Sequence, residues 1–194
     1  MPITINGSGT ITGLSAGGLP DGTITAADLA SGAARSNFGA GAILQVVQAV
    51  KTDVFSSGST SYVDITGMSA SITPSSSSSR IAIFVALTAG STAVNNIFQF
   101  LLLRGSTSIY AGDTRAGYNS VAIGGGRGIY DVNGANTFAL NYIDSPSTTS
   151  STTYKLQGRC EGGTFRINAN GSDTSGSVWS FTSASSIILM EIAG

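Results

Sequence analysis

Residues 43–74 read ILQVVQAVKTDVFSSGSTSYVDITGMSASITP, and this stretch decides the fold. Runs of β-branched and other apolar residues alternate in it with turns rich in Ser, Thr and Gly. Met68, Ala70 and Ile72 are separated by single Ser residues, which is the period of a strand with one buried face. The stretch therefore predicts a series of strands joined by short turns.

The run 43–50 predicts a strand that is apolar on both faces. Leu44 and Val46 are expected on one face, and Ile43 and Val47 on the other. A second apolar face is explained either by contact with another subunit or by long loops that cover a central strand, and the low charge of the chain favours the subunit contact. We therefore expect the first subunit contact at this strand.

The rest of the chain repeats this pattern. Gly162 and Gly163 predict a hairpin turn between two strands, residues 124–126 predict a turn, and Arg166 and Asn168 are expected to point outward. No long helical pattern is present, so we expect an all-β, antiparallel, jelly-roll-like sandwich. The further strands are expected at residues 62–65, 68–73, 80–87, 97–104, 108–110, 138–143, 154–160, 165–169 and 186–192.

The composition excludes several classes of function. Charged residues make up 10% of the 194 residues and the net charge is −1, so we expect no nucleic-acid partner. No apolar run is long enough for a membrane helix, so we expect no membrane insertion. The chain has no His and one Cys, Cys160, which is expected to be a small buried residue. We expect no cofactor.

The N-terminal segment 1–42 differs from the remainder, because it is rich in Gly and sparse in apolar residues. We expect two parts, an attachment arm at 1–42 and a β-sandwich head at 43–194. The candidate attachment residues are Leu14, Leu19, Pro20 and Leu29. Two alternatives stay open, an arm that is ordered against a partner and a disordered tail. No signal peptide is visible, so synthesis in a cytoplasm is expected.

The chain offers little catalytic chemistry. A Gly-rich loop at 124–128 lacks the Lys-Ser/Thr ending of a phosphate loop, and 131–134 lacks most ligands of a calcium loop. Scattered loop acids are typical of turns, although the sequence leaves a glycosidase pair open. We assign no catalytic residue and no metal site, and expect no enzyme. The acids concerned are Asp113, Asp131, Asp144 and Asp173.

Four aromatic residues lie in loop-like surroundings rich in Asn, Asp, Ser and Gly. An exposed aromatic ring beside short polar groups is typical of sugar-binding sites. Ordinary core or interface aromatics are the alternative interpretation. The four candidate receptor-binding residues are Tyr110, Tyr118, Tyr130 and Trp179.

Several stretches resemble proteins of bacteriophage particles. Residues 11–30, ITGLSAGGLPDGTITAADLA, resemble the N-terminal parts of phage tail-fibre-like proteins. The blocks 43–50, 61–67 and 71–74 and the ending ILMEIA at 188–193 are similar to a β-domain of phage virion proteins, marine and cyanobacterial phages among them. The resemblance is weak across 105–150.

This resemblance implies a tail fibre or receptor-binding protein of the virion. It implies a homotrimer, an arm at 1–42 that binds a phage tail or baseplate protein, and a head that binds a host surface glycan or protein. The implied location is the tail of the virion. Two alternatives remain open, a capsid decoration or head-fibre protein and a polysaccharide-degrading tailspike.

Overall fold

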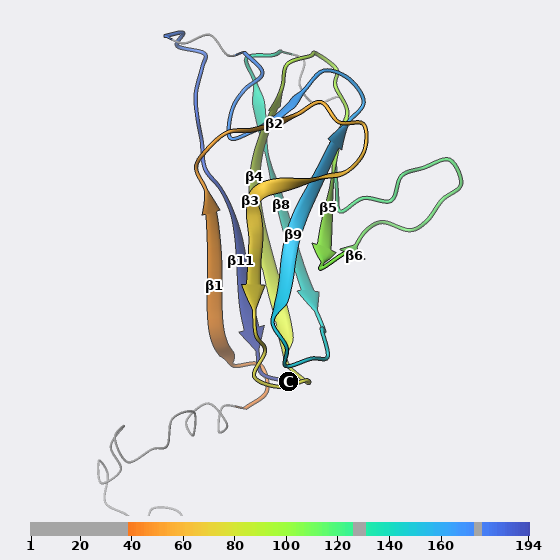
Figure 1. The fold of residues 1–194 in the computed structure, drawn as a ribbon, viewed down its shortest axis with the longest axis vertical. Helices are drawn as coiled ribbons and strands as arrows, with labels where there is room; N and C mark the ends of the chain where they lie inside the picture. The colour runs from red at the N-terminus through yellow and green to blue at the C-terminus, as the bar shows by residue number, and fades with distance from the viewer. Residues whose placement is uncertain (1–38, 126–130, 173–175) are drawn as a thin grey trace, which may run out of the picture. The chain divides into compact units, whose positions relative to one another are not determined.

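The computed structural model describes residues 39–125, 131–172 and 176–194 (Figure 1). They form strands and no helix, so no described helix is long and apolar enough to cross a membrane. The strands are β1 (Ile43–Lys51), β2 (Phe55–Ser57), β3 (Val63–Ile72), β4 (Arg80–Ser91), β5 (Phe98–Arg104), β6 (Thr107–Tyr110), β7 (Ile123–Gly125), β8 (Ala135–Asp144), β9 (Thr152–Cys160), β10 (Phe165–Ile167) and β11 (Ser185–Ile192).

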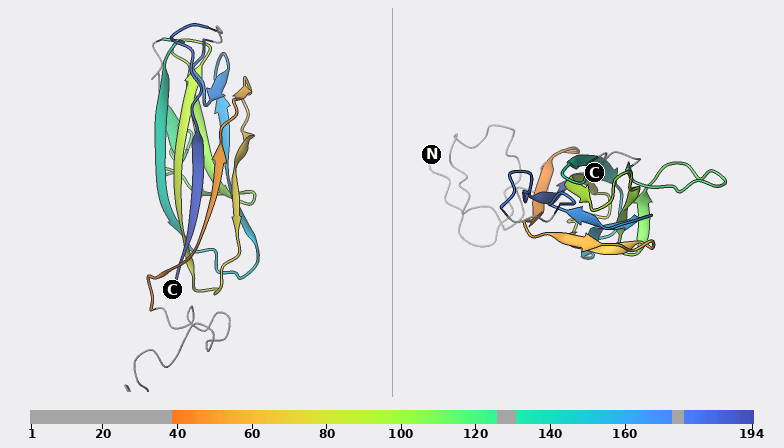
Figure 2. Two further views of the ribbon diagram at one scale, coloured as in Figure 1. Left: turned by 90° about the vertical axis from the view of Figure 1, so that its left-hand side faces the viewer. Right: turned by 90° about the horizontal axis from the view of Figure 1, so that it is seen from above.

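The strands form two antiparallel sheets that face each other (Figure 2). Sheet A has the order β1-β11-β4-β8, with β10 beside the end of β4 and β2 beside β10. Sheet B has the order β3-β9-β5-β6, with β7 also paired to β5. Eight strand positions remain if β2 and β10 are set aside and β6 and β7, which pair with the same side of β5, are counted as one position. Numbered along the chain, these positions have the order 1-8-3-6 in sheet A and 2-7-4-5 in sheet B, so successive positions change sheet except between 4 and 5. This is a jelly roll, so the expected fold class is confirmed.

One layer of apolar side chains fills the space between the sheets. Met68, Ala70 and Ile72 of β3 are buried, as the alternation predicts, and Cys160 is a buried free thiol among them. Aromatic rings join the two sheets at the centre. Phe98 of sheet B lies edge-on to Phe138 of sheet A, with ring centroids 5.6 Å apart.

The sandwich has two distinct ends. At the base, the chain enters β1 and leaves β11, and the backbone of Ala193 exchanges 2.8 Å hydrogen bonds with Gly41 and Ala42. Figure 1 shows the opposite end, the tip, where other loops gather. The tip loops are residues 52–54, 58–62, 92–97, 131–134, 161–164, 168–172 and 176–184.

The predicted hairpin at Gly162 and Gly163 is wrong. The chain does turn there, but β9 belongs to sheet B and β10 to sheet A, so the turn crosses between the sheets. Phe165 pairs with Ser91 and Ser57 of sheet A. The predicted turn at 124–126 is also wrong in its first part, because β7 includes residues 124 and 125 and pairs with β5.

Two predicted side-chain directions are wrong. A register irregularity between Ile43 and Gln45 shifts β1, so Ile43 and Val46 are both exposed while Val47 packs against the core. Asn168 is fully buried instead of exposed, because its φ of 66° departs from the extended backbone that the alternation assumes.

Truncation of Phe100 tests the central layer. Phe100 is fully buried, and its ring lies 5.9 Å from that of Phe165 and 6.0 Å from that of Phe138. We expect Phe100→Ala to lower the free energy of unfolding by about 3–5 kcal/mol, because it leaves a cavity between the sheets. Urea denaturation measures this loss. The control Leu101→Ala, on the other face of the strand, should lose much less, and equal losses would contradict the layer.

Candidate functional site

Asp144, the last residue of β8, belongs to a cluster of hydrogen-bonded polar side chains. Its carboxylate accepts hydrogen bonds from Arg104 Nη1 at 2.8 Å and from the Tyr154 hydroxyl at 2.7 Å. Burial raises the pKa of Tyr154, and the neighbouring Asp144 charge raises it further, so the phenol remains a donor. The arrangement stabilises the sandwich, since each polar group has a partner.

Of the other predicted acids, Asp131 takes part in a turn. Asp131 Oδ1 accepts hydrogen bonds from the backbone and side-chain nitrogens of Asn133, both at 2.9 Å, so the predicted turn chemistry is confirmed there. Asp113 is exposed in the β6–β7 loop, and Asp173 lies outside the described residues. Within the described ranges, no three His, Cys, Asp or Glu residues are grouped so that they could hold a metal ion.

Glu191 joins three segments at the base. Its side chain is buried and accepts hydrogen bonds from the backbone and hydroxyl of Ser75, the hydroxyl of Ser79 and the amide of Gln45, at 2.5 to 2.7 Å. Burial alone raises the pKa of Glu191, but these hydrogen bonds together hold it below its ordinary value. The carboxylate thus holds β11, β1 and the β3–β4 loop together where the chain enters the sandwich.

The charge of Glu191 should make the base sensitive to acid. The pKa of Glu191 is lower in the folded protein than its value of about 4.5 in the unfolded chain. The ionised carboxylate therefore contributes its full stabilisation above pH 4.5, and this stabilisation is lost as the pH falls through the pKa of the folded state. We expect Glu191→Gln to lower the free energy of unfolding by about 1–3 kcal/mol at pH 7 and to flatten its decline below pH 4.5. Urea denaturation at several pH values measures both. The exposed control Glu161→Gln should change neither, and an unchanged acid response of Glu191→Gln would contradict the role.

Exposed large apolar side chains fall into three groups. Five lie on the outer face of sheet A, five in the tip loops, and two in β6 and the loop after it. Within the described residues, none of them lies on the outer face of sheet B. The groups are, in this order, Ile43, Val46, Val50, Phe84 and Ile143; Val54, Val94, Val178, Trp179 and Phe181; and Tyr110 and Tyr118.

Trp179 is the largest exposed side chain of the tip, with 65% of its surface accessible. The side chain of Asn170, which is buried, binds the loop that carries Trp179. Asn170 Nδ2 donates to the carbonyl of Trp179 at 2.6 Å and to that of Asn133 at 3.1 Å. A buried amide therefore fixes the backbone of an exposed indole, which lowers the entropy cost of binding through that ring.

A second buried amide holds the same loop to the strands. Asn168 Nδ2 donates to the carbonyls of Lys51 and Asp53, at 2.8 and 3.0 Å. Its Oδ1 accepts the Ser185 hydroxyl at 2.6 Å, and its carbonyl accepts the amide of Ser183. The start and end of the β10–β11 loop are thus joined to the end of β1.

A groove of about 340 Å³ lies in the tip, and its lining begins at Ser180, the residue that follows Trp179. Apolar and hydrogen-bonding side chains share its walls, which is the composition expected of a site for a polar ligand with apolar faces. The lining residues are Val54, Arg166, Ala169, Asn170, Ser172, Ser180, Phe181 and Thr182.

The other predicted receptor residues lie elsewhere. Tyr118 is 64% exposed in the β6–β7 loop, which extends away from the sandwich in Figures 1 and 2, and the Arg115 guanidinium lies 4.3 Å from its ring centroid. Tyr110 stacks on Tyr142 of sheet A, with centroids 4.9 Å apart. Tyr130 lies outside the described residues. The sandwich therefore does not bring Trp179, Tyr118 and Tyr110 into one site.

The candidate attachment residues cannot be placed in the same way. They precede Gly39, where the described chain begins, and so lie outside it. These residues are Leu14, Leu19, Pro20 and Leu29.

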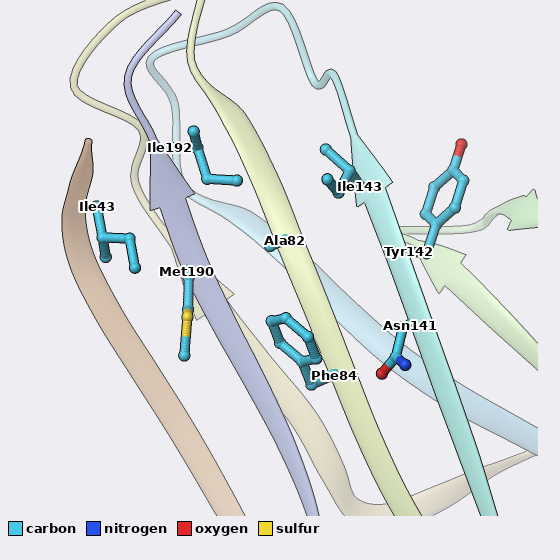
Figure 3. A pocket seen from close by; sticks show the side chains of 8 residues that line it. All are labelled: Ile43, Ala82, Phe84, Asn141, Tyr142, Ile143, Met190 and Ile192. Atoms are coloured by element: carbon cyan, nitrogen blue, oxygen red, sulfur yellow. The ribbon is translucent and has the colours of Figure 1, made fainter. Parts of the chain in front are cut away.

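The outer face of sheet A is largely apolar. Three adjacent rows of side chains cross its four strands, and Figure 3 shows members of two of these rows, among them Met190, Phe84 and Ile143, around a groove of about 520 Å³ that Ala82 also lines. Val46, Phe84 and Ile143 are 55%, 39% and 51% exposed. The rows, from β1 to β8, are Val46, Met190, Ala82 and Ile143; Gln48, Ile188, Phe84 and Asn141; and Val50, Ser186, Ala86 and Ala139.

The outer face of sheet B is polar by contrast. Asp64 accepts hydrogen bonds from Lys155 Nζ at 2.8 Å and from Gln157 Nε2 at 2.7 Å. The hydroxyls of Ser71 and Thr153 lie 2.7 Å apart on the same face. The polar groups of this face form hydrogen bonds with one another and with water. Of the two outer faces described, that of sheet A is therefore the one whose burial against another molecule would be favourable.

The sequence analysis did not identify most residues of these surfaces. Phe84 and Ile143 were predicted only as members of strands, and their outward direction depends on the pairing of β4 with β8. The signal available was the apolar character of both strand faces. Asn170 and Phe181 carried no signal, since their roles depend on contacts across the tip.

Comparisons with known proteins complete this description. No protein-family model matches the chain, and no curated protein matches it significantly. A chain in the structure of infectious bursal disease virus Gt strain is similar at 16% identity and a TM-score of 0.41, over 77% of this chain and 42% of that chain. A chain in the crystal structure of the infectious bursal disease virus VP2 subviral particle is similar at 15% identity and a TM-score of 0.41, over 76% and 41%. This chain therefore spans less than half the length of either.

Proposed function

We propose that the chain is a virion structural protein of a bacteriophage, a tail fibre that binds the host surface through the tip of its β-sandwich. The observation that carries the proposal is the separation of the two ends. The chain enters at the base, where Glu191 and the backbone of Ala193 hold it, and the exposed apolar loops lie at the opposite end. A protein held at the base would present its tip to the host.

The base is the proposed attachment side. Residues 1–42 precede β1 and bind a tail or baseplate protein in this proposal, with Leu14, Leu19, Pro20 and Leu29 as the contacts. The hydrogen bonds of Gly41 and Ala42 to Ala193 support it, because they join the entering chain to the sandwich. Force on the arm then reaches β1 and β11 directly.

The tip is the proposed receptor side. The ring of Trp179 offers an apolar face for the C–H groups of a sugar or for an apolar protein side chain, and the adjacent groove offers amide and hydroxyl groups. One such site binds weakly. In the proposed homotrimer, three tips bind together and gain avidity, because the later contacts are intramolecular. The role is binding without catalysis.

Replacement of Trp179 tests the receptor role. We expect Trp179→Ala to reduce binding of the purified chain to host envelopes at least tenfold, because an interface loses its central aromatic anchor. A sedimentation assay with labelled protein measures the binding. The control Val94→Ala changes an exposed residue of another tip loop and should bind normally. Normal binding by Trp179→Ala would overturn the assignment of the receptor site to the tip.

The location on the particle separates the tail fibre from a capsid decoration or head fibre. We expect immunogold label against the chain at the tail of the virion. Label on the capsid would overturn the tail assignment and favour the decoration protein. Release of reducing sugar from host envelope by the purified chain would instead favour the polysaccharide-degrading tailspike.

A further inference from the structure

We propose that the outer face of sheet A is the surface through which copies of this chain associate, with the β1 edge of one copy beside the β8 edge of the next. This inference rests on the homotrimer of the proposed function, but it does not depend on the receptor role. The copies surround an axis parallel to the strands, and the three outer faces turn toward it.

The burial of this face would cost little in desolvation. The three rows contain no charged side chain, and their only amides are Gln48 and Asn141; the exposed Arg80 lies one row beyond them, at the start of β4. Four strands at about 4.8 Å and six residues at about 3.4 Å give a face of about 19 by 20 Å, near 390 Å² in projection. That is the size of the largest apolar patch on a typical soluble monomer, and such a patch is often functional.

The order of residues within the rows favours a second copy over other occupants. In a threefold arrangement the β1 edge of one copy lies beside the β8 edge of the next at the same height along the axis. The β1 residue of each row then lies beside the β8 residue of the same row in the next copy. Gln48 then meets Asn141, so each amide finds a hydrogen-bonding partner. The neighbouring rows join apolar residues, Val46 with Ile143 and Val50 with Ala139.

The width of the face suits three copies. Three sheets, each about 19 Å wide, form a triangle whose central axis lies about 5.5 Å from each sheet. Two packed sheets lie about 10 Å apart, so the side chains of one face extend about 5 Å from their sheet. Side chains from three copies therefore reach the axis without a channel. The groove over Ala82 receives apolar side chains of the neighbours.

Cysteine cross-linking of the full chain tests the arrangement. In the double variant Val46→Cys/Ile143→Cys, the two positions of one copy lie about 14 Å apart across three strand spacings, too far for a disulfide within the chain. We expect mild oxidation to give a covalent trimer on denaturing gels. The native Cys160 is 1% exposed and should not react.

Matched controls define the outcomes of the cross-linking. Each single variant, Val46→Cys or Ile143→Cys, should give no covalent trimer, since each lacks the opposite thiol. Ser69→Cys, on the outer face of sheet B, should also give none. A covalent dimer of the double variant would overturn the threefold arrangement, and the absence of any cross-link would overturn the edge-to-edge contact.

Charge substitution tests the surface independently. We expect Ile143→Glu to reduce the mass in sedimentation equilibrium threefold, to that of the monomer, with an unchanged circular dichroism spectrum. Ser69→Glu is the control on the polar face and should remain trimeric. If Ile143→Glu remains trimeric, the proposal that sheet A is the contact surface is wrong, whereas the homotrimer itself is retained. The contact would then lie in residues 1–38 or on another surface. A monomeric unmodified chain at micromolar concentration overturns both, whereas envelope binding tests the receptor role separately.

Discussion

The contact between aromatic rings of the two sheets is the interaction on which the rest of the structure depends. Phe98 and Phe100 of sheet B meet Phe138 and Phe165 of sheet A, with centroids 5.6 to 6.0 Å apart. The fit is close, because a Cβ on Gly158 would lie 2.9 Å from the Phe165 ring. Since side chains alternate along a strand, this inner layer decides which residues of every strand face outward.

The inner layer leaves the two outer faces with different surroundings. On sheet B, outward residues such as Asp64 and Lys155 satisfy one another and water. On sheet A, outward residues such as Phe84 and Ile143 remain exposed. Both sheets pack against the same core, so the difference does not arise from folding. It is explained if only sheet A is covered in the assembled particle.

Sequence patterns predicted the features that depend on one strand alone. The alternation of β3, the burial of Cys160 and the strand class of nearly the whole head follow from period and composition. Pairing between strands is not local, so the sheet change between Cys160 and Phe165 was missed. Asn168 was missed for a further reason, since its positive φ reverses a direction that a regular strand would give. The candidate receptor residues were each proposed singly, and their separation depends on loops that no sequence pattern describes.

The distribution of apolar side chains connects assembly with binding. A sandwich holds one inner layer, so apolar residues beyond it must be exposed or covered by another molecule. Within the described residues they gather on the outer face of sheet A, in the tip loops, and in β6 and the loop after it, whereas the outer face of sheet B carries none of the large exposed ones. Copies joined through sheet A, about an axis parallel to the strands, would all direct their tips the same way. In the proposed trimer, the contact between the sheet A faces would thereby set the spacing of the three Trp179 side chains.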